Sequence, residues 1–496
     1  MSTHTLHDWT AMASKASPRG QAFIDGDFVD SASRETSAAV NPATGARLAD
    51  VAACDEVDVD RAVAAARASF ESGVWSQASP AERKRVLLRL ARLLEERTDE
   101  LALLVSLEMG KLVMDAVHVD VPFTAGCFQW YAETTDKVYG EVAATSRGDL
   151  ALVTREPLGV IGAIVPWNFP LNIAAWKLAP ALAPGNSVVL KPAEQSSLSA
   201  LLLAELAAEA GIPSGVLNVV TGTGDSTGQA IGRHMQVDCL AFTGSTLVGK
   251  RLMSYAAESN LKQVWLECGG KSANLVFADC DDLAAAADKA CQGIFFNQGQ
   301  VCSANSRLLV ERGIKEEFLS MVLERAAPIR PGDPLDPASR MGAMAGELHT
   351  ERVMAAIAAG RDEASLVLGG SRVSVGDSDC FVEPTVFDNV PNGVRLAQDE
   401  IFGPVLAVIP FDTEQEALQL ANQSPFGIAA SVWTGSLSRA HRVAGGLNVG
   451  TVSVNTVDAM SNQTPFGGVK QSGFGRDLSL HALNQYTALK TTWISY

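Results

Sequence analysis

The sequence has 496 residues, of which 47% are hydrophobic, so it is too long for one ordinary core and two large domains are expected. A formal net charge of -17 argues against nucleic-acid and anionic-membrane partners, because both favour a basic face. The eight cysteines lack paired spacing and the N-terminus lacks an apolar signal segment, which predicts a cytoplasmic protein without disulfides, a metal site or a membrane span.

The first predicted elements are expected to have a structural role. The stretch GQAFIDGDFVD predicts a hairpin that turns at Asp25 and Gly26, between two short apolar runs. Ser79, Pro80 and Glu82 form a helix-start signal, and leucines at helical spacing follow. A long amphipathic helix is therefore expected from residue 80.

From Val160 to Glu267, short β-branched runs alternate with helix-length segments, which is typical of a parallel, doubly wound sheet. A second pattern of this kind follows, with the strand-like runs NLVFAD, RLLVE, VLAVIPF, IAASVWT and TVSVN. We expect an α/β protein with two doubly wound, Rossmann-like parallel-sheet domains. The final stretch, YTALKTTWISY, alternates like a strand but has no evident sheet of its own, so it is expected to pair with a neighbour, which another subunit could provide.

Polar residues follow the strands of the first half. Asn168 lies in PWNFP after the first run, and its stiffened amide could stabilise an oxyanion or be an ordinary turn residue. Lys191 and Glu194 of KPAE end the second run and could bind ribose hydroxyls or form a surface ion pair. Because these positions are carboxyl ends of predicted parallel strands, they are expected to share the ligand-binding edge of one sheet.

Two later predicted strands of the first half end at residues that could bind a phosphate or act as a general base. Gly244 and Ser245 of FTGSTLVG could hold a phosphate on a helix N-terminus, or form a structural turn. Glu267 precedes Cys268 and the glycines Gly269 and Gly270, which leave room beside its carboxylate. It could be a general base or half of a salt bridge.

Cys302 is the candidate nucleophile. It lies in GIFFNQGQVCSAN, just after a polar, glycine-containing turn in the first crossover of the second half. The alternative is a buried structural cysteine, which is the common fate of a free thiol. No histidine lies in these motifs, so any base for the thiol is expected to be a carboxylate.

Seven motifs resemble those of the NAD(P)-dependent aldehyde dehydrogenase superfamily in order and spacing: PWNFP, KPAE, FTGST, LECGGKSAN, FNQGQVC, DEIFGPV and PFGGVKQSGFGRD. The resemblance runs from near residue 20 to the C-terminus. It implies the aldehyde dehydrogenase fold with a small β oligomerisation flap. It also implies that Cys302 attacks the aldehyde, that Asn168 holds the oxyanion, and that Glu267 activates the water that hydrolyses the thioester.

The resemblance implies NAD as cofactor. Glu194 on the adenosine ribose favours NAD over NADP, because its carboxylate would repel a 2′-phosphate, although some relatives accept both. The cofactor-binding residues expected are Pro166, Trp167, Lys191, Glu194, Gly244, Ser245, Gly269, Glu400 and Phe402.

The expected domain organisation follows from the same resemblance. Residues 1–135 and 155–270 would form the NAD-binding domain and residues 271–470 the catalytic domain. Residues 136–154 and 480–496 would be oligomerisation strands of a dimer or tetramer.

The substrate prediction rests on a resemblance to the bacterial aminoaldehyde branch, including γ-glutamyl-γ-aminobutyraldehyde dehydrogenases, through WYAETTDKVYGEVA and the C-terminal stretch. Asp120 could bind a substrate ammonium or be a solvated carboxylate. The loop NTVDAMSNQT departs from that branch, so an uncharged aliphatic or aromatic aldehyde is the alternative, and a non-catalytic binding role is the alternative of another class. The expected pocket residues are Asp120, Phe169, Ile173, Trp176, Phe296, Val301, Ser303, Asp458 and Phe466.

Two residues depart from the usual family pattern. Cys268 places a second thiol beside the expected base, which suggests sensitivity to oxidation. Asp477 stands where many family members have glutamate, so the side chain that carries this carboxylate is shorter here.

Overall fold

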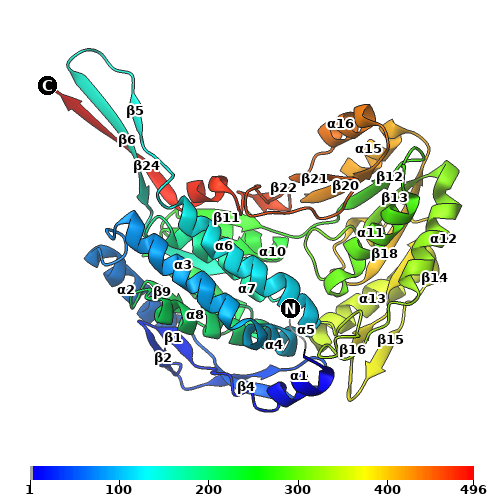
Figure 1. Cartoon of the computed structure of the whole chain (residues 1–496), viewed down its shortest axis with the longest axis horizontal. Helices are drawn as coiled ribbons and strands as arrows, with labels where there is room; N and C mark the ends of the chain where they lie inside the picture. Colours follow the sequence, from blue (N-terminus) through cyan, green and yellow to red (C-terminus); the bar gives the residue numbers. More distant parts are fainter. Residues whose placement is uncertain (1–3) are drawn as a thin grey trace.

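A computed structural model describes residues 4–496, and the chain is built around two large sheets (Figure 1). The first sheet has eight strands in the order β2-β1-β9-β8-β7-β10-β11-β23, and its five central strands are parallel. Its strands are β1 (Ala22–Ile24), β2 (Asp27–Val29), β7 (Val160–Ile164), β8 (Ser187–Lys191), β9 (Leu217–Val219), β10 (Cys239–Thr243), β11 (Gln263–Glu267) and β23 (Gly473–Phe474).

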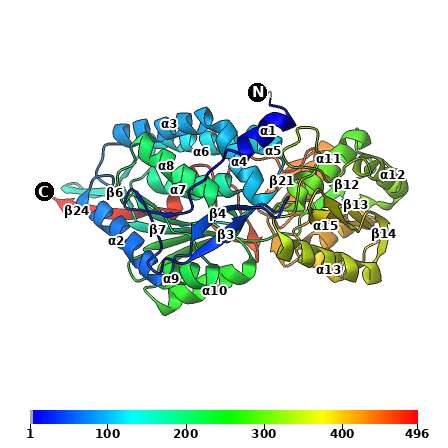
Figure 2. The ribbon, with the colours of Figure 1, turned by 90° about the horizontal axis from the view of Figure 1, so that it is seen from below.

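Helices cover both faces of this sheet, as Figure 2 shows, with α3, α6, α7 and α8 on one face and α2, α9 and α10 on the other. Two separate hydrophobic cores fill these layers. The doubly wound arrangement predicted for the first half is therefore confirmed. The helices are α2 (Glu56–Ser72), α3 (Pro80–Glu96), α4 (Thr98–Met109), α6 (Val121–Thr134), α7 (Pro170–Leu182), α8 (Leu198–Ala210), α9 (Gln229–Arg233) and α10 (Thr246–Glu258).

The register of the first sheet brings its polar strand ends together. Thr243 pairs with Glu267 across β10 and β11, and Ile164 pairs with Lys191 across β7 and β8. Because these strands are parallel, their carboxyl ends share one edge, as expected for a ligand-binding edge.

The second sheet has seven strands in the order β14-β17-β18-β13-β12-β20-β21, and all its pairs are parallel except β14 with β17. Cys302 lies in the crossover between β12 and β13, as predicted. The strands are β12 (Ala273–Val276), β13 (Arg307–Glu311), β14 (Ser365–Leu368), β17 (Thr385–Asp388), β18 (Val405–Phe411), β20 (Ala429–Trp433) and β21 (Thr451–Val454).

Helices also cover both faces of the second sheet, where two further hydrophobic cores lie. The α/β class with two doubly wound sheets is thus confirmed. The helices are α11 (Leu283–Phe295), α12 (Lys315–Ala326), α13 (Glu347–Glu363), α14 (Arg395–Gln398), α15 (Glu414–Asn422) and α16 (Leu437–Gly446).

A three-stranded flap projects from the first half and carries the C-terminus toward its tip (Figure 1). Its strands are β5 (Glu141–Ala143), β6 (Asp149–Pro157) and β24 (Thr487–Ser495). The last strand pairs antiparallel along its whole length with β6 of the same chain. The neighbour expected for this strand is therefore found within the chain, and β6 continues to Pro157, beyond the flap boundary predicted at residue 154.

The remaining elements are short. The predicted hairpin turns at Asp25 and Gly26, whose φ angles are 55° and 88°, and a capping box of Ser79 and Glu82 begins α3, so both predictions are confirmed. The other elements are α1 (Leu6–Ala13), β3 (Thr36–Val40), β4 (Arg47–Ala52), α5 (Val113–Asp115), β15 (Arg372–Val375), β16 (Ser378–Val382), β19 (Phe426–Gly427), β22 (Val469–Lys470), and the helical turns η1 (Ala116–Asp120), η2 (Glu194–Ser196), η3 (Gly224–Gly228), η4 (Phe296–Gly299), η5 (Arg312–Ile314) and η6 (Leu480–Gln485).

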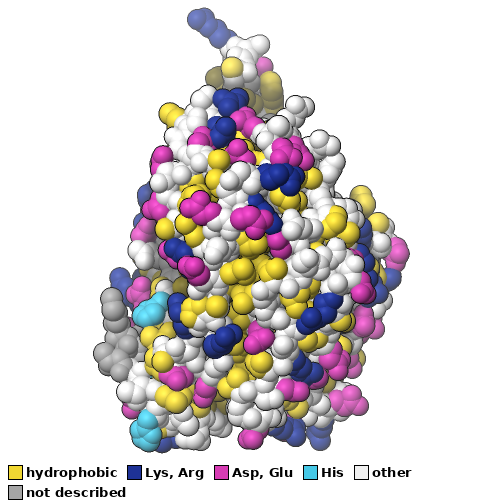
Figure 3. Space-filling model, turned by 90° about the vertical axis from the view of Figure 1, so that its right-hand side faces the viewer, with side chains coloured by type: hydrophobic (Ala, Val, Ile, Leu, Met, Phe, Trp, Pro, Cys, Tyr) yellow, Lys and Arg dark blue, Asp and Glu magenta, His cyan; other side chains and the backbone are white. Residues whose placement is uncertain are grey.

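The surface is polar and mixed in charge. On the face shown in Figure 3, lysine and arginine side chains are dispersed among acidic ones. Over residues 4–496, the helices are too short or too polar to cross a membrane.

Candidate active site

Two cavities meet at Cys302. The larger has a volume of 830 Å³ and the smaller 290 Å³. Ile173, Thr243 and Cys302 line both of them. The half-buried thiol therefore borders two spaces at once.

The loop before Cys302 has a tight backbone that few sequences allow. Asn297 and Gln298 have φ angles of 49° and 56°, and Gly299 follows with 71°. A Cβ at Gly299 would lie 2.2 Å from the carbonyl oxygen of Gly403, so this position requires glycine. The polar run FNQG thus forms a constrained turn that ends α11 and presents the thiol.

Side-chain hydrogen bonds hold this loop in place. The Gln300 Oε1 accepts from the Ala345 backbone N–H at 3.0 Å, and the Gln298 Nε2 donates to the Ala343 carbonyl at 2.7 Å. Both partners precede α13, so the loop is fixed to the second half.

Asn168 lies beside Cys302 in the lining of the larger cavity and is 2% exposed. Its Nδ2 donates to the Gln300 carbonyl at 2.9 Å, while the Asn297 Nδ2 donates to the Asn168 carbonyl at 3.1 Å. An asparagine amide has two N–H donors, so one can serve a developing oxyanion.

The electrostatic surroundings keep the Cys302 thiol protonated. Burial raises its pKa far above the ordinary value, and the carboxylates of Asp458, Glu400 and Glu267 raise it further. The backbone N–H of Ser303 opposes this shift. Because the pKa remains raised, the thiol needs a base to become a nucleophile.

Glu267 is the carboxylate suited to that role. It is 4% exposed and lines the smaller cavity, and its Oε2 has no hydrogen-bond partner among residues 4–496. Burial raises its pKa well above the ordinary value, as does the nearby Asp477, while Lys177 opposes the shift. Lys177 and Asp477 form a buried ion pair at 2.5 Å.

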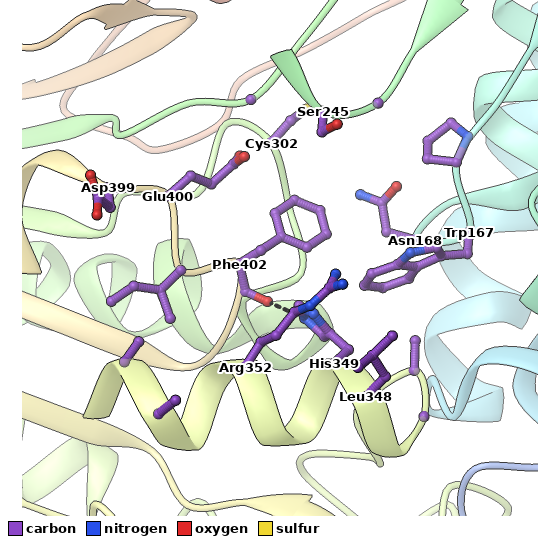
Figure 4. A pocket seen from close by; sticks show the side chains of 18 of the residues that line it. Trp167, Asn168, Ser245, Cys302, Leu348, His349, Arg352, Asp399, Glu400 and Phe402 are labelled. Atoms are coloured by element: carbon purple, nitrogen blue, oxygen red, sulfur yellow. Dashed lines mark hydrogen bonds between the residues drawn. The ribbon is translucent and has the colours of Figure 1, made fainter. Parts of the chain in front are cut away.

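Glu400 and Phe402 line the larger cavity on the side of the second half (Figure 4). The Glu400 Oε1 accepts from the Gly270 backbone N–H at 2.9 Å, and burial raises the pKa of Glu400 to about 7. A Cβ at Gly269 would lie 2.1 Å from the Glu400 Oε2, so the glycine makes room for this carboxylate.

His349 and Arg352 also line the larger cavity, and sequence reasoning missed both. Figure 4 shows them on α13, across the space from Trp167. The His349 ring lies 5.1 Å from the Trp167 ring, and its Nε2 is 2.8 Å from the Phe402 carbonyl. No local motif marks α13, because only tertiary packing brings it to the site.

The larger cavity has the features that a dinucleotide requires. Gly244 and Ser245 line it at the N-terminus of α10, where backbone N–H groups favour a phosphate. A Cβ on Gly244 would lie 2.6 Å from the Phe242 ring, so glycine is needed there. Pro166, Trp167 and Gly269 line the same space.

Lys191 and Glu194 lie at the end of β8 but outside that lining, which their neighbour Gln195 reaches. The Lys191 Nζ is 3.9 Å from the Glu194 Oε1, which accepts from the Gly224 backbone N–H at 2.7 Å. The two side chains are therefore close together, and Glu194 is exposed to solvent.

The smaller cavity is lined mainly by aromatic and aliphatic side chains. Its principal acidic group besides Glu267 is Asp458, which accepts a hydrogen bond from the Ser303 hydroxyl at 2.6 Å. Eight of the nine pocket residues expected from the sequence line it: Phe169, Ile173, Trp176, Phe296, Val301, Ser303, Asp458 and Phe466.

Asp120 is the ninth, and the structure does not bring it to the cavity. It is 0% exposed, and its Oδ1 is 2.7 Å from the Lys111 Nζ. A fully buried carboxylate needs a counter-charge, and here the chain itself supplies the ammonium. The interpretation of Asp120 as a ligand of a substrate amine is therefore corrected.

Cys268 lines the larger cavity, but burial raises the pKa of its thiol to about 12, with a further contribution from Glu267. A thiol with a raised pKa forms little thiolate at neutral pH. Because the thiolate is the form that reacts with oxidants, slow oxidation of Cys268 is expected.

Comparison with known proteins gives one consistent result. Residues 28–492 match the Aldehyde dehydrogenase family. The NADP/NAD-dependent aldehyde dehydrogenase PuuC of Escherichia coli (strain K12) is 51% identical, over 100% of this chain and 99% of that protein. The structure of an indole-3-acetaldehyde dehydrogenase of P. syringae, in complex with NAD+ and IAA, is 54% identical, with a TM-score of 0.99 over 100% of both chains. That of a γ-glutamyl-γ-aminobutyraldehyde dehydrogenase of Burkholderia cenocepacia J2315 is 52% identical, with a TM-score of 0.98 over 99% of this chain and 100% of the other.

Proposed function

Because this chain belongs to the aldehyde dehydrogenase family and is an NAD(P)-dependent aldehyde dehydrogenase, we propose that it oxidises an aldehyde to the carboxylic acid through a covalent intermediate on Cys302. The observation that carries this proposal is the position of Cys302 in the lining of both cavities. A thiol at that boundary can hold the aldehyde carbon between the two sites. NAD, when bound in the larger cavity, supplies the hydride acceptor.

The first step is attack of the Cys302 sulfur on the aldehyde carbon. A C–S bond forms, the electrons of the carbonyl double bond move to oxygen, and the thiol proton passes to a base. Glu267 has a free Oε2 in the same cavity, so it can accept this proton. The Asn168 amide donates to the oxyanion of the resulting thiohemiacetal.

The second step is hydrolysis of the Cys302 thioester that remains after the hydride has left. The proton that Glu267 accepted in the first step must first pass to solvent. Glu267 then takes a proton from water, the oxygen adds to the thioester carbon, and the C–S bond breaks to release the acid and the Cys302 thiolate, which recovers a proton from Glu267. A carboxylate whose pKa is raised by burial accepts a proton more readily near neutral pH.

We propose an aldehyde that carries an amine, such as γ-glutamyl-γ-aminobutyraldehyde, as the substrate. Asp458 supports this choice, because it is an accessible carboxylate in an otherwise largely apolar cavity. The ring of Phe296 in the same cavity adds a surface for a cation–π contact with the ammonium. The Burkholderia relative, which is named a γ-glutamyl-γ-aminobutyraldehyde dehydrogenase, favours this class.

An aromatic aldehyde is the second candidate. Five aromatic side chains line the smaller cavity, and Trp176 lies 5.2 Å from Phe466 between ring centroids. Such a surface binds an uncharged ring well. The P. syringae relative, named for indole-3-acetaldehyde, favours this alternative.

The experiment that separates the candidates measures NADH formation with γ-aminobutyraldehyde, butyraldehyde and phenylacetaldehyde. The proposal predicts a higher kcat/KM for the amine than for butyraldehyde, and loss of this preference in Asp458→Asn. Asp377→Asn, in the exposed turn between β15 and β16, is the matched control and should keep the preference. A preference for phenylacetaldehyde would favour the aromatic candidate, and failure to oxidise all three would favour a binding role.

We propose that the first-sheet domain holds the dinucleotide, that the second-sheet domain carries the nucleophile, and that the flap joins copies of the chain into a dimer or tetramer. The flap supports this because Leu489 and Trp493 of β24 are 61% and 60% exposed, and Val142 of β5 is 70% exposed. Large apolar side chains on a projecting sheet favour a protein partner. A monomeric mass by light scattering would contradict the oligomer.

A further inference from the structure

A buried charge lies beneath the wall of the smaller cavity. Lys111 follows α4 and is 0% exposed. Its Nζ lies 2.7 Å from the Asp120 Oδ1 and 3.7 Å from the centroid of the Phe169 ring. The ammonium therefore contacts a carboxylate and an aromatic face together.

Phe169 connects this charge to the substrate cavity. It directly follows Asn168 at the N-terminus of α7, and its side chain lines the cavity. Its ring stacks on that of Phe296, with centroids 6.2 Å apart and planes 29° apart. Both residues are only half-buried, so close packing does not fully hold their rings.

Stability alone is a weak reason for placing a charge pair here. Desolvation of two buried charges usually cancels much of their attraction, and apolar side chains of similar volume often do as well. A desolvated ammonium over an aromatic face is, in contrast, a directional contact that fixes the plane of the ring. The Asp120 Oδ2 has no hydrogen-bond partner among the described residues, so Lys111 provides the chief compensation for this carboxylate.

We propose that Lys111, held by Asp120, is a positioning residue that fixes the Phe169 ring and, through it, the aromatic wall that recognises the body of the aldehyde. Lys111 lines neither of the two cavities, so it acts through Phe169 and not by contact with substrate. The inference rests on the proposed assignment of the smaller cavity to the aldehyde. Specificity for bulky aldehydes then depends on the charge of Lys111, which lies outside the pocket.

The proposal predicts an effect on KM and little effect on kcat. Asn168 is held independently by Asn297 and Gln300, so the oxyanion donor should stay in place when the Phe169 ring loosens. A bulky aldehyde needs the ordered wall, whereas a short aldehyde at Cys302 does not reach it.

The test neutralises the pair while keeping its volume, in the double variant Lys111→Met/Asp120→Asn. We expect KM for phenylacetaldehyde to rise severalfold, up to about thirtyfold, the limit that a desolvated cation–π contact sets, with kcat and the KM for propionaldehyde changed less than about twofold. The matched control is Lys315→Met/Asp388→Asn, which neutralises another buried pair, at 2.6 Å, and should leave both KM values unchanged.

Graded fluorination of the phenylalanine at position 169 provides a second readout, in which the wild-type background is compared with the double variant. Fluorine weakens the negative ring face without changing its shape much, so KM for phenylacetaldehyde should rise with each added fluorine. In the Lys111→Met/Asp120→Asn background this slope should vanish. A merely structural role for Lys111 would leave the same slope in both backgrounds.

The outcomes separate this inference from the proposed function by means of Phe169→Leu. If Phe169→Leu raises KM for phenylacetaldehyde but the neutralised pair and ring fluorination do not, the role of Lys111 is overturned and the cavity assignment stands. If Phe169→Leu leaves every KM unchanged, the aldehyde does not use this cavity and the proposed assignment fails.

Discussion

Gly269→Ala should weaken NAD binding by displacing Glu400. The added Cβ would lie 2.1 Å from the Glu400 Oε2 and 2.6 Å from its Cδ. The oxygen must retreat by about 1.3 Å to reach an ordinary 3.4 Å contact, and the 2.9 Å hydrogen bond from Gly270 to Oε1 would then be lost or badly stretched. If the displaced carboxylate then loses one hydrogen bond to the cofactor, and a hydrogen bond to a charged group contributes about 2 kcal/mol, KM for NAD should rise about thirtyfold.

The assay is steady-state kinetics with varied NAD and saturating aldehyde, together with the Kd for NAD by calorimetry. Gly393→Ala is the control, because a Cβ there meets open space. If the effect passes through Glu400, Gly269→Ala should add little in a Glu400→Ala background. An unchanged KM for NAD, or effects that simply add, would refute this reasoning.

Three further variants test cofactor choice, pH dependence and stability. Glu194→Gln removes a charge that would repel a 2′-phosphate, so initial rates should show at least about a tenfold rise in kcat/KM for NADP relative to NAD; a wild-type enzyme that already prefers NADP would contradict this. Because burial and Asp458 raise the pKa of Cys302, stopped-flow acylation rates should increase with pH as the thiolate forms, and Asp458→Asn should move this rise to lower pH; a shift to higher pH would be inconsistent. Asp477→Asn leaves the Lys177 ammonium unpaired and should cost about 3–5 kcal/mol of unfolding free energy, measured by denaturant titration. Since Asp477 raises the pKa of Glu267, the rise of thioester hydrolysis with pH should also move to lower pH in this variant, and no shift would argue against the coupling.

The sequence predicted the fold well, and its local patterns also indicated Asn168, Glu267 and Cys302 as candidate catalytic residues, which the structure places in the lining of the two cavities. Strand runs with polar residues at their ends placed Asn168 and Glu267 at one edge, and parallel pairing makes that edge common to all strands. The turn before Cys302 needs left-handed backbone at three successive residues, which its polar and glycine residues signalled.

Residues whose role depends on packing between distant segments were not predictable in the same way. His349 reaches the larger cavity only because α13 packs against the loop of Phe402. Asp120 looked available for a substrate amine because its partner Lys111, although only nine residues earlier, is not at helical spacing from it, and the chain changes direction between them. Sequence spacing reports neighbours on one element, whereas the partner of a buried charge is set by the tertiary fold.

The covalent intermediate on Cys302 is tested most directly by trapping it in Glu267→Gln. This variant keeps the thiol but lacks the carboxylate that acts as base in both steps. At a pH high enough to form the Cys302 thiolate without Glu267, mixing it with NAD and phenylacetaldehyde should give a burst of NADH followed by almost no turnover. Mass spectrometry should then find the acyl group on the peptide that contains Cys302. A burst with no adduct, or an adduct on another cysteine such as Cys268, would contradict the mechanism.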